Sequence, residues 1–306
     1  MISISATVES IEQAQALLDS GIDTLYFGEE HFGLRLPQSF SREEQQQLTE
    51  LAHQQGAKVT IAVNGIMHPE KMKEVPAYLD FLASIHVDQI MVGDPGIIYL
   101  LRKGEYDLPF IYDGETLVTN SRQMNFWHQK GALGSVLARE VPFGEMIKIS
   151  EKLAGFAEVQ VYGATCIHQS KRPLLTNYYH FTRNEERADK ERGLFLAEPQ
   201  DPDTHYSIFE DEHGTHIFAT NDLNLMAQLA ELTTYGYTHW KLDGLFTKGA
   251  NFVEIARRFV AAKELLESQQ WSQMAADKLT AEVAKYHPQE RELDTGFYAI
   301  DPEAIK

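Results

Sequence analysis

The sequence predicts a (β/α)8 TIM-type barrel, and three observations point to this class. Short runs rich in β-branched residues alternate along the chain with amphipathic stretches that carry helix caps. The short runs are mostly apolar throughout, which is typical of parallel strands covered on both faces. Eight such units in 306 residues fit a closed barrel better than an open sheet. A doubly wound sheet stays open, although no glycine-rich phosphate loop follows the first strand.

The elements are placed in order by apolar runs and by caps. The eight predicted strands are 2–8, 24–28, 58–64, 89–94, 110–113, 135–139, 158–163 and 239–243. The predicted helices are 10–20, 42–55, 70–85, 97–103, 120–130, 143–153, 222–232 and 252–268. Ser10 and Ser41 cap the first two helices, and Gly21 and Gly56 lie just past their C-terminal ends. Pro95 stands where the first turn of a helix tolerates proline.

A long insertion, residues 164–220, separates the seventh and eighth predicted strands. Its segment 171–192 is basic and polar, unlike the acidic remainder of the chain. Residues 206–210 and 215–219 form a predicted hairpin, with its turn at 211–214. Because the insertion follows the C-terminal end of a strand, we expect it on the face of the barrel that carries active sites.

Two regions follow from this organisation. We assign residues 1–270 to a barrel that includes the insertion, and residues 271–306 to a C-terminal extension. The extension holds a helical piece and an irregular end, and we expect it to pack on the outside of the barrel. A chain of this length buries roughly 75% of its unfolded surface, so its core needs no disulfides or metal.

Composition limits the classes of function. The net charge of −18 argues against tight nucleic-acid binding by this chain alone, although a local basic patch or a basic partner stays open. No apolar run reaches the roughly 18 residues of a membrane span, and the first ten residues do not resemble a secretion signal. With one cysteine, Cys166, the chain forms no internal disulfide, so we expect a cytoplasmic protein.

Polar residues gather at the predicted strand ends, which meet at one mouth of a barrel. The candidate binding residues there are Arg35, Asn64, Arg139, Lys241 and Asp243, and the candidate acids and bases are His68, Asp94, Glu115 and Glu140. The cations suit a carboxylate or phosphate, which arginine binds through a bidentate fork. Carboxylates with displaced pKa values, or a histidine, suit proton transfer. Arg139 and Glu140 are adjacent, so at most one of them points inward.

Several of these residues also have a purely structural interpretation. Asp94 precedes Pro95 and is at least as well explained as a helix cap. His68 precedes Pro69 and suits a cap or a solvated loop, Asn64 can hold a loop, and Asp243 suits a turn. The cations are harder to explain structurally, because charges that converge in a barrel mouth need partners.

Metal binding is poorly supported by the sequence. The twelve histidines show no HExxH or similarly close ligand spacing, and an iron–sulfur cluster usually takes about four thiolates. Cys166 precedes Lys171 and Arg172, which favour a thiolate, and Arg172 joins the candidate binding residues. A nucleophilic Cys166 and a buried structural Cys166 both stay open, the second being the more common outcome for cysteine.

Residues 158–177, EVQVYGATCIHQSKRPLLTN, resemble the signature of the peptidase U32 family. The positions that match are Glu158, Gly163, Ala164, Cys166 and Leu175. The positions that differ are Gln160 for a phenylalanine, Lys171 for a glycine, Pro173 for a second cysteine and Thr176 for a serine. Further family-like blocks follow in order along the chain. They are YFGEEHFGLR at 26–35, VNGIMH at 63–68, GDPG at 93–96, VLARE at 136–140, EDEHGTHIF at 210–218, KLDG at 241–244 and DTGFY at 294–298.

The resemblance implies a barrel and offers two activities. The family name comes from collagenase-like peptidase activity. No serine–histidine–acid pattern, zinc motif or carboxylate dyad is recognisable in this sequence. A cysteine peptidase would need a histidine, such as His168, beside Cys166. One branch of the family is similar to prephenate-dependent proteins that make 5-hydroxyuridine at the tRNA wobble position. Some of these proteins work as two paralogous chains, and this sequence resembles the short, cysteine-poor one.

Three hypotheses follow from the resemblance. In the first, this chain is a subunit of a tRNA uridine hydroxylation system, with prephenate or another small carboxylate as its ligand. An iron–sulfur cluster is then expected only on a longer U32 partner, through which the complex holds tRNA. In the second, the chain is a U32 peptidase that uses Cys166 or another site. In the third, it is a barrel without catalytic activity that positions a partner.

Overall fold

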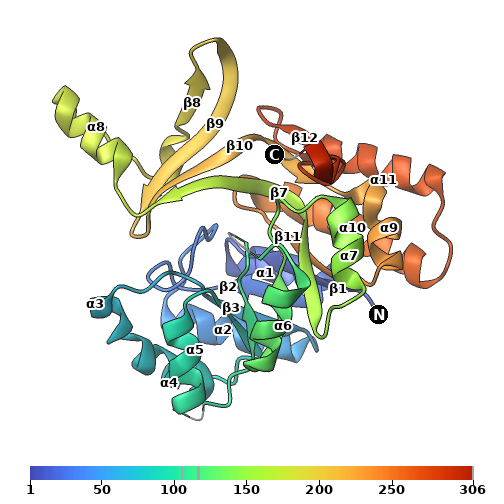
Figure 1. Cartoon of the computed structure of the whole chain (residues 1–306), viewed down its shortest axis with the longest axis horizontal. Coiled ribbons are helices and arrows are strands. Elements are labelled where there is room, and N and C mark those ends of the chain that lie inside the picture. The colour runs from blue at the N-terminus through green and yellow to red at the C-terminus, as the bar shows by residue number, and fades with distance from the viewer. Residues whose placement is uncertain (105, 116–117, 305–306) are drawn as a thin grey trace.

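Eight parallel strands close into a barrel in the computed structural model, which describes residues 1–104, 106–115 and 118–304 (Figure 1). The barrel strands are β1 (Ser3–Thr7), β2 (Thr24–Phe27), β3 (Lys58–Val63), β4 (Gln89–Val92), β5 (Phe110–Tyr112), β6 (Ala132–Val136), β7 (Phe156–Ser170) and β11 (His239–Leu242). They pair in chain order, and β11 closes the ring between β7 and β1. The predicted fold class is therefore confirmed.

Helices cover the outside of this barrel (Figure 1). They are α1 (Ile11–Asp19), α2 (Arg42–Gln54), α3 (Pro69–Met72), α4 (Val75–Ser84), α5 (Pro95–Lys103), α6 (Ser121–Gln129), α7 (Phe143–Ser150), α9 (Leu229–Thr234) and α10 (Gly249–Glu267). Ser10 and Ser41 cap α1 and α2 as predicted, and Ser41 forms a capping box with Glu44. The prediction of a single helix at 70–85 is wrong. Pro76 lacks the N–H that a continuous helix needs there, so α3 ends at Met72 and α4 begins at Val75, with Pro76 in its first turn.

Apolar side chains fill two layers on either side of the strands. The outer layer joins the strands to the helices and includes the fully buried Trp240, Tyr78 and Phe259. A smaller cluster takes the alternate residues of the strands and therefore lies inside the barrel. Its members are Tyr26, Leu36, Ala62, Met91, Ile111 and Val136. This inner cluster forms an apolar floor beneath the polar strand ends.

The insertion continues the barrel sheet instead of starting a separate unit. The seventh strand was predicted to end at Gly163, but β7 runs on to Ser170 and pairs antiparallel with β10 (Gly214–Asn224). β10 in turn pairs with β9 (Asp201–Asp211), which confirms the predicted hairpin. A helix beginning at Asp222 was wrong: Asp222 lies in β10, where Arg291 from the distant C-terminal extension binds its carboxylate at 2.6 Å.

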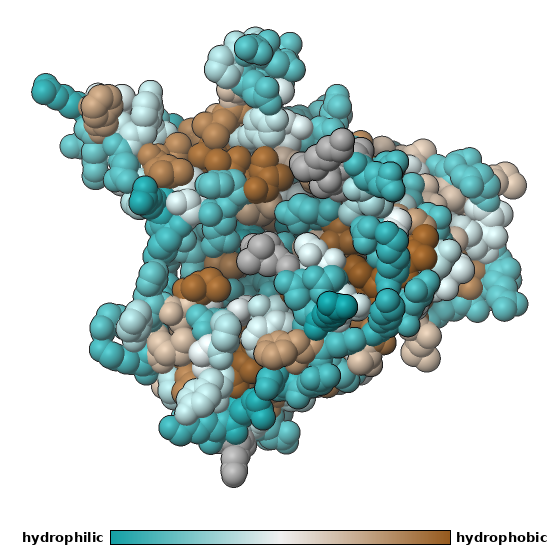
Figure 2. Space-filling model, viewed as in Figure 1, coloured by the Kyte–Doolittle hydropathy of each residue, from teal (hydrophilic) through white to brown (hydrophobic). Residues whose placement is uncertain are grey.

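Part of the insertion projects away from the barrel. Figure 1 shows α8 (Leu174–Thr182) at the far end of one arm and β8 (Phe195–Glu198) with β9 in a second arm. None of the described residues of α8 is buried, and Phe181 is 87% exposed. Figure 2 shows a hollow between the α8 arm and the lower part of the barrel. The insertion therefore leaves apolar and basic side chains uncovered above the strand ends.

The C-terminal extension packs on both the barrel and the insertion (Figure 1). It contains α11 (Gln273–Tyr286), which contacts α10, then β12 (Glu292–Asp294), which pairs with β10, and a short turn of helix at Pro302–Ala304. Its last predicted residues, 305–306, lie outside the described residues. Within the described part of the chain, no helix combines the length and the hydropathy that crossing a membrane requires.

Candidate active site at the barrel mouth

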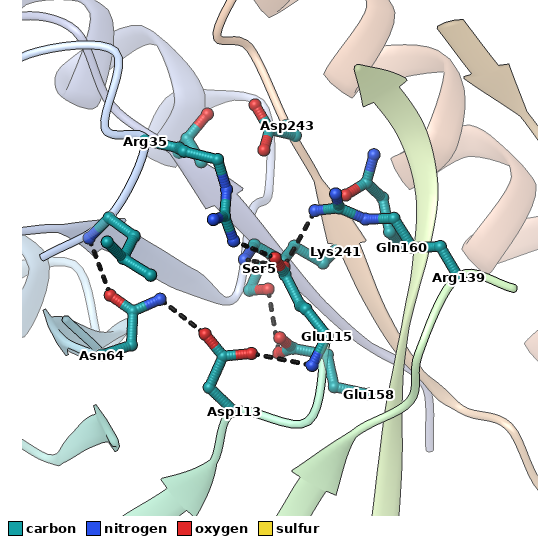
Figure 3. A network of polar contacts seen from close by, with 12 residues as sticks. Ser5, Arg35, Asn64, Asp113, Glu115, Arg139, Glu158, Gln160, Lys241 and Asp243 are labelled. Carbon is teal, nitrogen blue, oxygen red and sulfur yellow. Dashed lines mark hydrogen bonds and ion pairs between the residues drawn. The ribbon is translucent and has the colours of Figure 1, made fainter. Parts of the chain in front are cut away.

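A single carboxylate, that of Glu115, lies at the centre of the barrel mouth and binds three cations (Figure 3). Its Oε2 accepts a hydrogen bond from Arg35 at 2.6 Å. Its Oε1 accepts from Arg139 at 2.9 Å and from Lys241 at 3.3 Å. All four side chains are at least 92% buried. The sequence predicted that these residues would converge, and the structure brings them together on an acid of the same chain.

The barrel topology explains why residues far apart in sequence meet here. Arg35 follows β2, Glu115 follows β5, Arg139 follows β6, and Lys241 lies on β11, so four strand ends contribute. Arg35 has a φ of 51°, a left-handed conformation that costs a non-glycine residue about 1 kcal/mol or more. Its ion pair and its 2.8 Å hydrogen bond to Gln169 hold it there.

The cations control how Glu115 ionises. Burial alone would raise the pKa of Glu115, but the charges of Arg139, Lys241 and Arg35 overcome burial and hold that pKa far below its usual range. In the same way, burial would lower the pKa of Lys241, and Glu115 raises it above its ordinary value. Lys241 also lies 4.3 Å above the ring of Tyr26. The three cations therefore favour the ionised form of Glu115.

A second set of carboxyl groups surrounds the ion pairs and was missed as site residues. Asp113 accepts a hydrogen bond from Asn64 at 2.6 Å and from the backbone N–H of Glu115 at 3.0 Å. Glu158 lies deeper and accepts from Ser5 at 3.2 Å. Burial raises the pKa of Asp113 and of Glu158, and the nearby charge of Glu115 raises both further. Both carboxyl groups therefore hold a proton more readily than an exposed acid does.

The sequence offered a signal for one of these residues but not for the other. Asp113 ends the fifth predicted strand, so the strand-end rule applies to it as it does to its neighbours. Glu158 lies near the start of the parallel part of β7, away from the strand end. Its side chain lies below Lys241 only because it points into the barrel. Asp243 is buried at the end of β11, where its carboxylate accepts from the backbone of Leu245 at 2.9 Å, and burial raises its pKa.

Four buried polar atoms around this cluster have no hydrogen-bond partner among the described residues. They are Nε of Arg139, Oε1 of Glu158, Oε1 of Gln160 and the hydroxyl of Tyr26. Buried polar atoms are nearly always paired, so a polar ligand or water that reaches these positions gains hydrogen bonds. Figure 3 shows Arg139 and Gln160 side by side beyond Glu115.

A cavity of about 500 Å³ opens onto the cluster, a volume that suits a small molecule. Its polar wall consists of Arg35, Asn64, His68, Asp113, Glu115, Gln169, Lys171 and His213. The exposed His68 therefore lines the mouth without joining the ion pairs, and it caps α3 without a side-chain hydrogen bond. Asn64 also holds the backbone N–H of Leu34 at 2.9 Å, so it supports both the loop and the site.

The remaining predicted residues lie elsewhere. Asp94 caps α5 by accepting from the backbone of Gly96 at 2.6 Å, and it also holds Met67 at 2.9 Å. Glu140 is exposed while its neighbour Arg139 points inward, in line with the expected alternation. Arg172 is exposed on the insertion, and Cys166 is partly exposed on β7.

An iron–sulfur cluster does not fit the donors of this chain. The sequence holds one cysteine, whereas such clusters usually take about four thiolates. Among the described residues, no group of three or more His, Cys, Asp and Glu side chains is placed to hold a metal ion.

With the barrel and its mouth in place, comparison with known proteins gives the family. Residues 9–306 match the model of Peptidase family U32. The chain belongs to this family. A U32 relative, tRNA hydroxylation protein P2 of Bacillus subtilis, is 37% identical over 286 residues, which are 92% of this chain and 92% of that protein.

Other relatives are longer than this chain. tRNA hydroxylation protein P of Escherichia coli is 25% identical over 80% of this chain, and the match spans 63% of that protein. tRNA hydroxylation protein P1 of B. subtilis is 26% identical over 78% of this chain and 57% of that protein. Among solved structures, the U32 peptidase Mk0906 superposes with a TM-score of 0.51 at 16% identity, over 79% of this chain and 92% of that one, which supports the fold.

Proposed function

We propose that this chain acts in tRNA uridine 5-hydroxylation, as the short, cysteine-poor subunit that works with a longer U32 chain. The observation that carries this proposal is the 37% identity to a tRNA hydroxylation protein, P2, over 92% of both chains. Proteins with related names in the longer class match less of their own length, which is consistent with a division into short and long chains.

The charge distribution supports a shared task. The chain carries a net charge of −18, which disfavours close approach to tRNA by this chain alone. Its single cysteine leaves redox chemistry to a partner with more thiols. In this proposal, the longer paralog holds any iron–sulfur cluster, and tRNA is bound by the complex.

The barrel mouth supplies the small-molecule part of the proposal. Arg35, Arg139 and Lys241 already bind one carboxylate, so their geometry suits a carboxylate ligand. A dicarboxylate such as prephenate would enter the cavity of about 500 Å³, which Arg35 and Glu115 line, and compete with Glu115 for Arg35. Arg139 and Lys241 lie outside the lining of this cavity and share the carboxylate of Glu115 with Arg35.

Nucleoside mass spectrometry tests the pathway. Bulk tRNA is compared between cells with the gene, without it, and with the gene restored. We expect 5-hydroxyuridine and its derivatives to fall without the gene and to return with the wild-type chain. An unchanged profile in cells that hold no redundant pathway would overturn the proposal.

The same assay separates a binding site from a scaffold. Arg139→Gln keeps the size and polarity of the side chain but removes its charge, and Glu140→Gln is the exposed neighbouring control. We expect Arg139→Gln to abolish restoration while Glu140→Gln restores fully, with both proteins present at wild-type levels. Full restoration by Arg139→Gln would favour a scaffold. Affinity purification of the tagged chain tests the subunit claim, which fails if no longer U32 chain is recovered.

A further inference from the structure

A groove on the outside of the barrel lies between α5 and α6, which run next to each other in Figure 1. It has a volume of about 420 Å³ and is separate from the ion cluster of the mouth. Its walls are formed from α5 by Pro95, Ile98, Tyr99, Arg102 and Lys103, and from α6 and its C-terminal cap by Phe126, Trp127 and Lys130. The groove therefore combines aromatic rings with cations, and none of the described residues that line it is acidic.

The aromatic rings of this groove are open to solvent. Tyr99 is 61% exposed, and Phe126 is 49% exposed. Trp127 is half-buried and meets the Phe126 ring edge to face, with the ring centroids 5.0 Å apart. Large rings that lie together at the surface of a folded chain are typical of a surface that binds another molecule.

Each exposed ring has a cation beside it. Nζ of Lys103 lies 5.7 Å from the centre of the Tyr99 ring, and Nζ of Lys130 lies 5.3 Å from the centre of the Phe126 ring. Arg102 and Lys103 occupy the last turn of α5, where cations favour the helix dipole. The dipole explains the cations but not the exposed rings. In a chain of net charge −18, three cations on one groove form a local positive surface.

The groove adjoins the barrel mouth. The Trp127 ring stacks on the Tyr112 ring with their centroids 4.2 Å apart, and Tyr112 lines the mouth cavity. Gly93 also lines that cavity, and Pro95 of the groove follows it closely in the chain. A polymer that is bound in the groove therefore lies next to the candidate active site.

We propose that the groove between α5 and α6 binds a single-stranded segment of RNA and holds it next to the barrel mouth. This inference rests on the proposed function in tRNA hydroxylation, and it names the surface of this chain that RNA contacts. Each nucleotide presents a flat base and a phosphate, so the two ring–cation pairs suit two successive nucleotides. The acidic side chains of a peptide would pair with the cations but would not stack on the rings, so RNA fits the groove better.

Fluorescence anisotropy of a labelled oligouridylate of about ten nucleotides tests the groove in the full chain. At about 50 mM salt, where phosphate contacts are strong, we expect saturable binding. An RNA duplex of the same length, whose bases are already stacked, should bind at least about tenfold more weakly. Phe126→Leu removes one ring and should weaken binding of the oligouridylate about tenfold. The matched control is Phe181→Leu, at an exposed ring on α8, and it should bind as the wild type does.

The contribution of charge is measured separately. Lys103→Gln removes an exposed cation of the groove, and it should lower the slope of log affinity against log salt concentration by about 0.7. Lys278→Gln on α11, where the lysine side chain is 73% exposed, is the matched control and should leave that slope unchanged.

A measurement on the wild-type chain guards against a variant that does not fold. A base stacked in the groove should quench the fluorescence of Trp127, and the quenching should disappear in Trp127→Phe, which keeps Trp240 and Trp271. The proposal is overturned by a lack of saturable binding, by equal affinities for Phe126→Leu and Phe181→Leu, or by equal binding of an oligoglutamate of the same charge. Loss of 5-hydroxyuridine without the gene, together with no RNA binding in the groove, would leave the hydroxylation proposal standing without this one. Binding in the groove with an unchanged nucleoside profile would do the reverse.

Discussion

The barrel mouth and the α8 arm of the insertion differ in how far their side chains are buried and paired. In the mouth, the Glu115 side chain is 6% exposed and forms ion pairs with three cations. On α8, none of the described residues is buried, and Phe181 is 87% exposed. The charged side chains of the mouth are thus paired within the chain, whereas the side chains of the α8 arm are exposed. Exposed apolar side chains, more than buried charges, therefore mark the part of this molecule that is left uncovered.

The largest expected effect comes from breaking the mouth at its centre. Glu115→Gln leaves Arg35, Arg139 and Lys241 buried without their counter-ion, and we expect the free energy of unfolding to fall by about 3–5 kcal/mol. Urea denaturation followed by circular dichroism measures the loss. Glu140→Gln, an exposed glutamate on a neighbouring strand end, should produce no measurable change. Equal stabilities for the two variants would show that the ion cluster does not hold the mouth together.

A smaller effect is expected where the extension meets the insertion. Asp222→Asn removes the charge that Arg291 binds at 2.6 and 2.9 Å, both side chains being buried. We expect a loss of about 2–3 kcal/mol, less than for Glu115 because Arg291 keeps its bonds to Ser207 and Ala219. Hydrogen exchange should rise first in β12 and the adjoining part of β10. Uniform exchange across the barrel would contradict a local anchor.

The next effect, on the stability of the mouth, depends on pH and tests whether a buried carboxyl group there is protonated. A carboxyl group whose pKa is higher in the folded chain contributes stability below its unfolded pKa and loses it as pH rises through the folded value. Burial raises the pKa of Glu158, so Glu158→Gln should avoid this loss. Relative to wild type, the variant should gain on the order of 1 kcal/mol as pH rises above the ordinary pKa of glutamate, about 4.3. Thermal melts across this range test the sign, and a constant difference would refute it.

The smallest effect is expected on the exposed arm. Phe181→Ala removes a large side chain that packs on little, so the free energy of unfolding should change by less than about 0.5 kcal/mol. The matched comparison is Phe259→Ala in the buried core, where about 3–5 kcal/mol should be lost. A large loss for Phe181→Ala would mean that α8 is covered in solution, by another copy or a partner, and size-exclusion chromatography would then show the difference.

Much of the candidate site was predictable because the barrel rule is general. Arg35, Glu115, Arg139 and Lys241 were all chosen from predicted strand ends, and the structure brings all four together. The sequence did not predict that Glu115 would be the shared partner of the three cations. Glu115 was predicted as an acid or base, and the sequence did not indicate that three cations would lower its pKa.

By itself, the sequence determined the order of βα units, most helix ends and the hairpin of the insertion, since caps, apolar runs and turns act over a few neighbouring residues. Only the tertiary structure decided how far β7 continues, that Asp222 joins a strand, and which acid the three cations bind. These outcomes depend on partners that lie 24 to 126 residues away in the sequence, or on which side of a strand faces inward. The free energy of burying each charge depends on the partners that surround it, and these come together only in the closed barrel.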